Sequence, residues 1–419
     1  MRVYRTVLTF LDQQRSKILA FPFETRKFIT SNFFFGLFNP FYIIFSNTFI
    51  FQATQGNLGE NIVYCIFTYL GILAGFVLSG LVASRISFRN LLIGGVWLMF
   101  VTIFQLFSIN PHRVNTLIVI LAGFFTGLGS GVYWSARNYL SLHLTTDSNR
   151  DFFSGIDYIL ISAGRILTPL IIGIYIGLGI KYHWFSASFA YRSVLTVALG
   201  LAIVVTLFTL RVPNNFYRKE GSLIVKTNSL WTAVRKMFFY LGFYQSAFFV
   251  VPTVFIMKFI GGENMVGTLN ALCYVLAILT IYYLSSRSAI EHRTRIMRTG
   301  FYIFLTGTLL FSLFLPFAAA LGTYFLIFFM FFTESILNYP ARATMLKATE
   351  EIKASVDADG YQYLTDIELF AEIGRIVGLI VFFILYHLLP YYISLPAYIV
   401  STAAIQWQTV KMSKQINGM

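Results

Sequence analysis

The sequence predicts an all-α membrane protein with 12 transmembrane helices in two six-helix halves, related by a pseudo-two-fold axis along the membrane normal. Three observations predict this fold class. First, 57% of the 419 residues are hydrophobic and only 11% are charged, too few to cover a soluble domain of this size. Second, the chain divides into apolar runs of membrane-spanning length. Third, a Gly-Arg-Ile triplet recurs at the centre of two of these runs.

An α-helix needs roughly 20 apolar residues to cross the hydrocarbon core of a bilayer. On this criterion the first six spans lie near 28–52, 61–83, 91–109, 116–139, 152–178 and 189–210. The other six lie near 236–258, 265–285, 299–317, 320–341, 363–388 and 390–409. The predicted division is therefore an N-terminal segment (1–27), an N-terminal bundle (28–211), an inter-half loop (212–232), a C-terminal bundle (233–410) and a tail (411–419).

The distribution of lysine and arginine predicts the orientation. With the N-terminus inside, 25 of the 31 basic residues fall in inner segments, four in outer segments and two within spans. This asymmetry follows the positive-inside rule, so both termini are expected in the cytoplasm. The basic residues form no single patch, which argues against nucleic acid as a partner despite the net charge of +14.

Short basic motifs of the first half recur in the second half, in the same order and 202–210 positions later. The pairs are Arg26-Lys27 with Arg235-Lys236, Ser84-Arg85 with Ser286-Arg287, Ala136-Arg137 with Ala341-Arg342, and Gly164-Arg165-Ile166 with Gly374-Arg375-Ile376. Because each half has an even number of spans, the two copies are expected to have the same orientation in the membrane. This is the parallel-repeat arrangement found in some transporters.

The segment after the second span, Gly80-Leu81-Val82-Ala83-Ser84-Arg85-Ile86-Ser87-Phe88-Arg89, resembles a motif of the major facilitator superfamily. Gly80, Arg85 and Arg89 match it, whereas Ser84 and Ser87 stand where that family has Asp and Gly. The glycine-rich fourth span (123–131) is also similar to the family. The segments 133–138 and 151–155 resemble a group of its bacterial members, which implies the plasma (inner) membrane of a bacterium.

The resemblance implies a secondary active transporter that works by alternating access, and not an enzyme. The substrate is expected to be a small organic molecule, anionic or zwitterionic if arginines bind it, with protons as the coupling ion and export as the direction. The expected partners are this substrate, protons and membrane lipids, with a monomeric protein and no cofactor. The five histidines show no metal-ligand spacing, so no metal site is predicted either.

Charged residues within spans are the main candidates for function. An ionisable group at that depth is energetically costly, so its presence indicates a functional role. Arg165 and Arg375 lie at matching depths, so they either clamp an anion or pair with acids on other helices. In the family fold the tenth span lines the cavity, and Glu334 there can exchange a proton. Glu372 is placed to neutralise Arg375 at i, i+3, and Glu368 to meet Arg85 at the seam between the halves.

The remaining site predictions complete three sets. The substrate-binding set is Arg165, Arg375, Asn39, Tyr133, Tyr244, Gln245 and Asn338; the proton-coupling set is Glu334, Glu372 and Glu368; the gating set is Arg85, Arg89, Asp157, Arg137 and Arg342.

Two alternatives remain open from the sequence. One is a transporter or flippase of an amphipathic or lipid-like substrate, which the 18% aromatic content allows. The other is a non-transporting membrane receptor on the same fold. The receptor alternative predicts that all buried charges are paired with one another.

Overall fold

The computed structural model describes residues 18–146, 149–216, 224–226, 228–285, 293–353 and 360–418. Within these ranges all regular structure is helical. Residues 1–17 of the predicted N-terminal segment, residues 217–223 and 227 of the predicted inter-half loop, and the Ser286-Arg287 repeat motif lie outside them.

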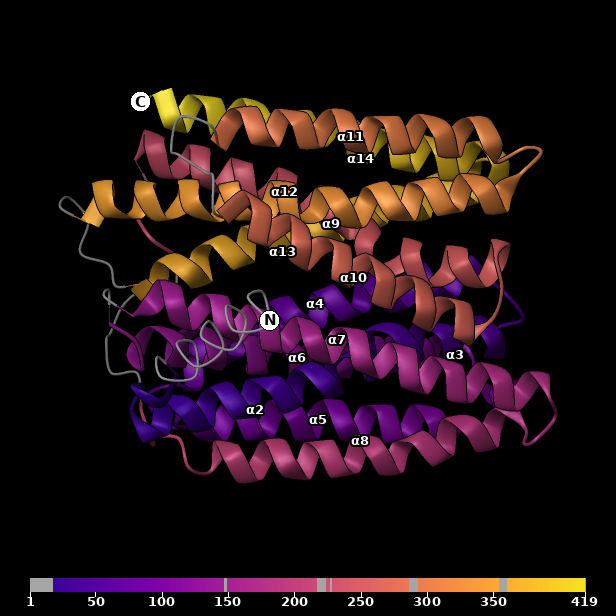
Figure 1. Cartoon of the computed structure of the whole chain (residues 1–419), viewed down its shortest axis with the longest axis horizontal. Helices are drawn as coiled ribbons and strands as arrows, with labels where there is room; N and C mark the ends of the chain where they lie inside the picture. Colours follow the sequence, from indigo (N-terminus) through magenta and orange to yellow (C-terminus); the bar gives the residue numbers. More distant parts are fainter. Residues whose placement is uncertain are drawn as a thin grey trace, which may run out of the picture.

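The helices fall into two groups, which we call the N-terminal helices (α2–α8) and the C-terminal helices (α9–α14). Figure 1 shows the first group in the lower part of the view and the second in the upper part. The first group is α2 (Phe23–Pro40), η1 (Phe41–Phe45), α3 (Ser46–Ala53), α4 (Leu58–Val82), α5 (Phe88–Ser108), η2 (Pro111–Arg113), α6 (Thr116–His143), α7 (Arg150–Lys181) and α8 (Ala187–Thr209). The second is α9 (Ser229–Phe259), α10 (Glu263–Ser285), α11 (Arg293–Phe314), α12 (Ala319–Lys353), α13 (Gly360–Leu388) and α14 (Tyr391–Gly418).

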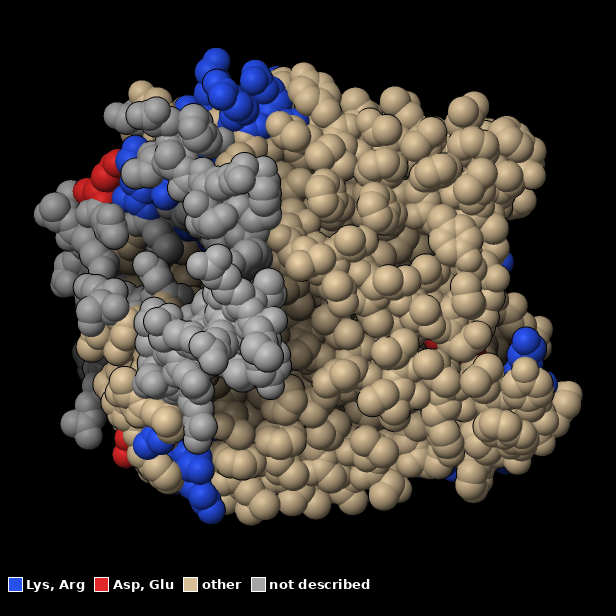
Figure 2. Space-filling view, in the orientation of Figure 1, with Lys and Arg blue, Asp and Glu red and all other residues tan. Residues whose placement is uncertain are grey.

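Eleven helical segments in the described part of the chain are long and apolar enough to cross a membrane. They match the first eleven predicted spans. The twelfth predicted span corresponds to the first part of α14, where polar residues such as Gln406 and Gln408 lower the hydropathy. The count of 12 and the pseudo-two-fold axis therefore stay predictions. In Figure 2 the charged side chains on the visible face lie toward the ends of the molecule, and most of the surface between them is uncharged.

Asparagine and serine side chains fix where several of these helices begin. Each accepts a hydrogen bond from a backbone N–H of the first turn, which has no carbonyl partner within its own helix. The caps are Asn57 of α4, Ser87 of α5, Asn115 of α6, Ser186 of α8 and Asn228 of α9, with donor–acceptor distances of 2.8–3.3 Å.

The first predicted span contains a π-helical turn. Helix α2 ends at Pro40, η1 covers Phe41–Phe45, and α3 continues to Ala53 without an intervening loop. Proline lacks the N–H of the regular helical ladder, and single π turns inside α-helices often occur at functional sites. The polar residues predicted for this span, Asn39 among them, therefore flank a local irregularity in the helix.

Both Gly-Arg-Ile triplets lie where two helices cross at backbone contact. A Cβ atom on Gly164 of α7 would lie 2.3 Å from the carbonyl carbon of Gly36 in α2. A Cβ atom on Gly374 of α13 would lie 2.1 Å from the backbone oxygen of Phe239 in α9. Glycine is therefore required at both positions, and each crossing places an arginine one residue further along the chain.

Two helices extend beyond the predicted spans that they contain. Helix α12 continues to Lys353, beyond the predicted end at residue 341, because residues 342–353 are mostly good helix formers. Helix α14 runs to Gly418, so the predicted tail at 411–419 is helical through its described residues.

Candidate functional site

One face of α12 carries the central acid of the candidate site. Phe331, Glu334 and Asn338 follow one another at helical spacing, so their side chains point to the same side. The Phe331 ring lies 5.2 Å from the ring of Tyr274 in α10, centroid to centroid. Asn338 accepts a 2.7 Å hydrogen bond from the Gln245 amide of α9. Glu334 lies between these contacts, half-buried, and itself has no hydrogen bond or ion pair in the described part of the chain.

Arg375 of α13 is held by polar groups of the C-terminal helices. It forms an ion pair with Glu372, one turn earlier in the same helix. Its Nε and Nη2 atoms donate to the side-chain oxygen of Gln245 at 3.1 and 2.6 Å. The guanidinium also lies 5.7 Å from the ring centroid of Tyr69, which belongs to α4. The pairing of Glu372 with Arg375 is the arrangement expected from their i, i+3 spacing, and it leaves Arg375 with little capacity for another anion.

Arg165 of α7 is in the opposite situation. Its Nε atom is buried without a hydrogen-bond partner, and its guanidinium forms no ion pair with any residue the structure describes. The groups near enough to act on its charge include Tyr274, Tyr42 and Glu334. Of the alternatives left open by the sequence, direct pairing of Arg165 with Glu334 or Glu372 is therefore not what the structure has. Arg165 retains free hydrogen-bond donors.

A second network joins α2, α6 and α7. Asp157 forms an ion pair with Arg137 and accepts a 2.7 Å hydrogen bond from the amide of Asn32. The Tyr133 hydroxyl donates to the Asn32 oxygen at 3.1 Å. Of the predicted gating residues, Asp157 and Arg137 are thus brought together. Tyr133, predicted to bind substrate, is fully buried in this network.

Three other predicted substrate-binding residues take part in side-chain hydrogen bonds. The amide nitrogen of Asn39 donates a 2.7 Å hydrogen bond to the Tyr42 hydroxyl, and the Asn39 amide oxygen is buried with no hydrogen-bond partner among the residues described. The Tyr244 hydroxyl shares a 3.0 Å hydrogen bond with Thr333, the residue before Glu334. Gln245 links Asn338 to Arg375, as described above.

The predicted contact between Glu368 and Arg85 is corrected by the structure. Glu368 instead lies 3.5 Å from Arg342, whose side chain is 62% exposed. The helical extension of α12 past residue 341 places Arg342 beside α13, which explains why it is the partner. Arg85 is exposed after the end of α4, and the Nε atom of Arg89 is buried with no hydrogen-bond partner in the part of the chain that the structure describes.

Two further buried acids, Asp366 and Glu263, were not predicted as site residues from the sequence. Asp366 forms a bidentate ion pair with Arg235, in which both hydrogen bonds are 2.8 Å long. It also accepts a 2.6 Å hydrogen bond from the indole N–H of Trp231. The repeat contained a signal for it, because Asp366 follows Asp157 by the same 209 positions that separate Arg235 from Arg26. Glu263, at the start of α10, gives no such signal.

Glu263 connects the two groups of helices at one end of the seam. It is 3% exposed and accepts hydrogen bonds from Gln52 of α3 and, at 2.9 Å, from the Tyr191 hydroxyl of α8. Close by, a Cβ atom on Gly267 of α10 would lie 2.1 Å from the backbone oxygen of Pro169 in α7. The predicted orientation makes this the outer end.

The other end of the seam is also in contact. The Tyr361 hydroxyl of α13 lies 2.7 Å from the Ser135 hydroxyl of α6, and its ring lies 5.5 Å from that of Tyr139. The N-terminal and C-terminal helices therefore touch both above and below the level of Arg165 and Glu334.

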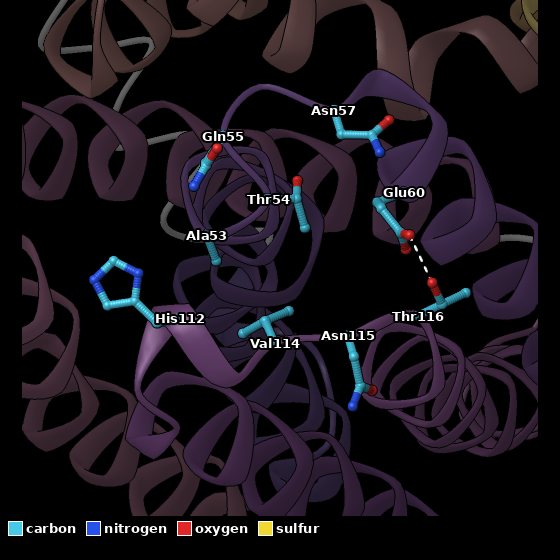
Figure 3. Close-up of a pocket in the computed structure, with 9 residues that line it drawn as sticks. All are labelled: Ala53, Thr54, Gln55, Asn57, Glu60, His112, Val114, Asn115 and Thr116. Atoms are coloured by element: carbon cyan, nitrogen blue, oxygen red, sulfur yellow. Dashed lines mark hydrogen bonds between the residues drawn. The ribbon is translucent and has the colours of Figure 1, made fainter.

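A pocket of about 360 Å³ lies apart from these charges (Figure 3). It is formed at one end of the N-terminal helices, where Glu60 accepts a 2.7 Å hydrogen bond from Thr116. Its lining is Ala53, Thr54, Gln55, Asn57, Glu60, His112, Val114, Asn115 and Thr116. None of the residues predicted for the site contributes to this lining, so the pocket is not the arginine site.

The fold and these buried charges define a class of protein, an integral multi-pass membrane transporter. The family model of the Major Facilitator Superfamily matches residues 28–356, and the chain belongs to this family. A relative in Bacillus subtilis (strain 168), the uncharacterized protein YqgE, is 24% identical over 371 residues, with 84% of this chain and 81% of the relative covered. A shorter match, 30% identical over 98 residues, is to an uncharacterized protein encoded in the sodM 3′ region of Geobacillus stearothermophilus; it covers 23% of this chain and 45% of the relative.

Two solved structures share the fold. Both are crystal structures of a bacterial homologue of the iron transporter ferroportin, one inward-facing and one outward-facing. The inward-facing structure matches with a TM-score of 0.63 at 13% identity, covering 94% of this chain and 98% of that one. The outward-facing structure also has a TM-score of 0.63, at 12% identity with 95% and 100% covered. The likeness is equal for both states, so it shows the fold and not the conformation.

Proposed function

We propose that the protein is a proton-coupled secondary transporter that carries a small organic solute across the bacterial inner membrane by alternating access. Arg165 is the observation that carries this proposal, since it is a membrane-depth arginine whose guanidinium has no hydrogen-bond or ion-pair partner among the described residues. Such a side chain is unfavourable unless a polar partner reaches it. A small anionic or zwitterionic solute is that partner in our proposal.

Glu334 is the proposed proton site. It faces the same region as Arg165, from the C-terminal helices, and has no ion pair or hydrogen bond among the described residues. Protonation changes its charge, so it changes the balance of forces between the two groups of helices. A proton bound there in one state and released in the other couples transport to the proton gradient.

The free arginine also weighs against two other readings. A receptor without transport activity predicts that all buried charges are paired, whereas Arg165 has no ion pair within the described part of the chain. The ferroportin homologues are named for iron, yet a free guanidinium repels a metal cation. Arg165 therefore favours an anionic group over a cation in this site. Both termini in the cytoplasm and a monomeric state are part of the same proposal.

The proposal can be tested with protein in liposomes under an imposed pH gradient, using a panel of small organic anions and zwitterions. Glu334→Gln should abolish gradient-driven accumulation while exchange of labelled for unlabelled substrate continues, because the neutral side chain still allows the halves to rock. Glu351→Gln is the matched control, since Glu351 is exposed and its one ion pair among the described residues is with Lys347, 3.5 Å away. Equal accumulation by the wild type and Glu334→Gln would contradict the coupling role.

A further inference from the structure

The two arginines of the repeat differ in their capacity to bind an anion. Arg375 already has a carboxylate, from Glu372, and a side-chain oxygen, from Gln245. A substrate anion there would have to displace both. Arg165 has no such partner in the described part of the chain. The sequence allows a clamp in which both arginines bind one anion. With Arg375 already paired, only Arg165 remains to bind an anionic group.

The surroundings of Arg165 combine hydroxyl groups with apolar surface. Tyr42 and Tyr274 lie close to the guanidinium. Tyr274 also packs against a small apolar cluster that is separate from the main core. Its buried members are Ile44, Ile256, Val266, Cys273, Ile327 and Phe331. A ligand bound at Arg165 therefore meets polar groups at its charged end and hydrocarbon beside it.

We propose that the substrate is an organic monoanion whose carboxylate binds Arg165, and that Glu334 takes up one proton as the anion binds. This inference rests on the function proposed above and specifies its substrate class and the sign of its coupling. One negative charge and one proton enter the site together, so its net charge does not change.

The coupling follows from which charges act on Glu334. The arginines near it are Arg165 of α7 and Arg375 of α13, and the titratable hydroxyls are those of Tyr274 of α10 and Tyr244 of α9. The charge of Arg375 is already balanced by Glu372. When an anion neutralises Arg165, the Glu334 carboxylate loses its remaining opposite charge, and a proton replaces it. By reciprocity, a proton on Glu334 strengthens binding of the anion to the same degree.

Joint binding of anion and proton makes the protein a symporter. An inward proton gradient would then drive uptake of the anion, in contrast to the export expected from the family alone. A zwitterion would behave differently, because its ammonium group would compete with the proton for Glu334. The number of protons taken up on binding therefore distinguishes the two substrate classes.

The test uses purified full-length protein in weakly buffered solution near neutral pH, with lactate and benzoate as monoanion probes. Succinate serves as the dianion probe and glycine as the zwitterion probe. Lactate or benzoate should raise the melting temperature more at pH 5.5 than at pH 7.5, and should be accompanied by uptake of about one proton per bound anion. Succinate and glycine should have a smaller effect on both measurements.

Variants of Arg165 and Glu334 separate the roles of these two residues. Arg165→Gln should weaken lactate or benzoate binding by about 10-fold to 100-fold, the usual loss for a hydrogen bond to a charged group. Glu334→Gln should bind the same anions without proton uptake and with no pH dependence. Arg165→Lys keeps the positive charge but loses the paired N–H donors of the guanidinium, so partial binding is expected. Partial binding by this variant would also show that the site still folds. Arg192→Gln is the matched control, since Arg192 is exposed and, within the described ranges, donates a hydrogen bond only to the Ser108 carbonyl.

Three results would overturn the inference. They are binding of glycine or succinate in preference to both monoanions, binding of neither lactate nor benzoate, and anion binding without proton uptake by the wild type. If any of these occurs while pH-driven transport of another solute still requires Glu334, only the substrate class or the sign of coupling is wrong. If transport does not depend on Glu334 at all, the proposed function fails as well.

Discussion

At the residue scale, Arg375 and Glu372 depend on each other. The Glu372 side chain is only 3% exposed, and its Oε2 atom is buried with no hydrogen-bond partner among the described residues. Removing the arginine would leave this carboxylate buried without a counter-charge. Breaking a buried pair by deleting one member is strongly destabilising, whereas replacing both members can be nearly neutral.

We therefore expect Arg375→Gln to destabilise the protein by about 3–5 kcal/mol. The double variant Arg375→Gln with Glu372→Gln should recover most of that loss. Arg165→Gln, which removes no ion pair, should change stability far less. Thermal unfolding of the purified variants, monitored by circular dichroism, measures all three. Equal destabilisation by Arg165→Gln and Arg375→Gln would show that Arg165 has a structural partner after all.

The different surroundings of the two arginines were only partly predictable. The sequence places an acid three residues before Arg375 and a serine, Ser162, three residues before Arg165. This local difference predicts the Glu372 pair, because i, i+3 spacing is fixed by the helix itself. The contact of Arg375 with Gln245 depends on how α9 and α13 cross, which no local pattern determines. The same limit explains why the sequence does not predict the contact between Glu368 and Arg342.

At the element scale, the close crossing of α2 with α7 depends on small residues on both helices. A Cβ atom on Gly164 would lie 2.3 and 2.4 Å from the backbone of Gly36 and Leu37. These are backbone atoms, so no side chain can rotate away to make room. The helix axes would have to separate, and Arg165 would move with them.

Gly164→Ala is expected to lower stability by about 1–3 kcal/mol, the usual effect of overpacking, and to reduce transport. Gly200→Ala provides the control, because nothing lies within 4 Å of a Cβ atom at that position. There the substitution should be neutral or slightly stabilising, since alanine favours helix more than glycine does. Melting temperatures and transport rates of the two variants test the comparison. A Gly164→Ala variant as stable as Gly200→Ala would contradict the backbone contact.

Hydropathy predicted the membrane-spanning helices well, because burial in a bilayer requires a continuous apolar run that can be read along the chain. It did not predict the π turn at Phe41–Phe45 or the full length of α12. Both depend on backbone hydrogen bonding and packing around the helix, to which an average over a window is insensitive. The partners of the buried charges also depend on how the helices pack. The exception is a pair one helical turn apart, which the sequence does predict.

At the scale of the whole molecule, the N-terminal and C-terminal helices are in contact at both ends of their seam. Glu263 with Gln52 and Tyr191 joins them at one end, and Tyr361 with Ser135 at the other. Alternating access requires each set of contacts to break in turn. In the contacts around Glu263, the buried carboxylate has no cation partner among the described residues. The strength of this contact therefore depends on its two neutral donors, Gln52 and Tyr191.

Tyr191→Phe removes one of those donors and should open that end of the seam more often. Loss of one hydrogen bond to a charged group corresponds to a shift of about 10-fold in the population of the open state. A cysteine in place of Asn264 (Asn264→Cys) reports this opening. In the closed seam a Cβ atom on Gly177 of α7 would lie 2.7 Å from Asn264 Cβ, so α7 covers this position until the seam opens. In a background without Cys65 and Cys273, Tyr191→Phe should increase labelling of Asn264→Cys by a membrane-impermeant maleimide.

The matched control is Tyr175→Phe. Its hydroxyl lies 2.9 Å from Ser193, so the bond it loses lies within the N-terminal helices and does not cross the seam. Labelling should therefore stay at the starting level in that variant. Increased labelling in both variants would indicate general loosening of the fold, and none in either would mean that Glu263 does not hold this end closed. A selective increase with Tyr191→Phe follows only if the contact between the two groups of helices breaks during transport.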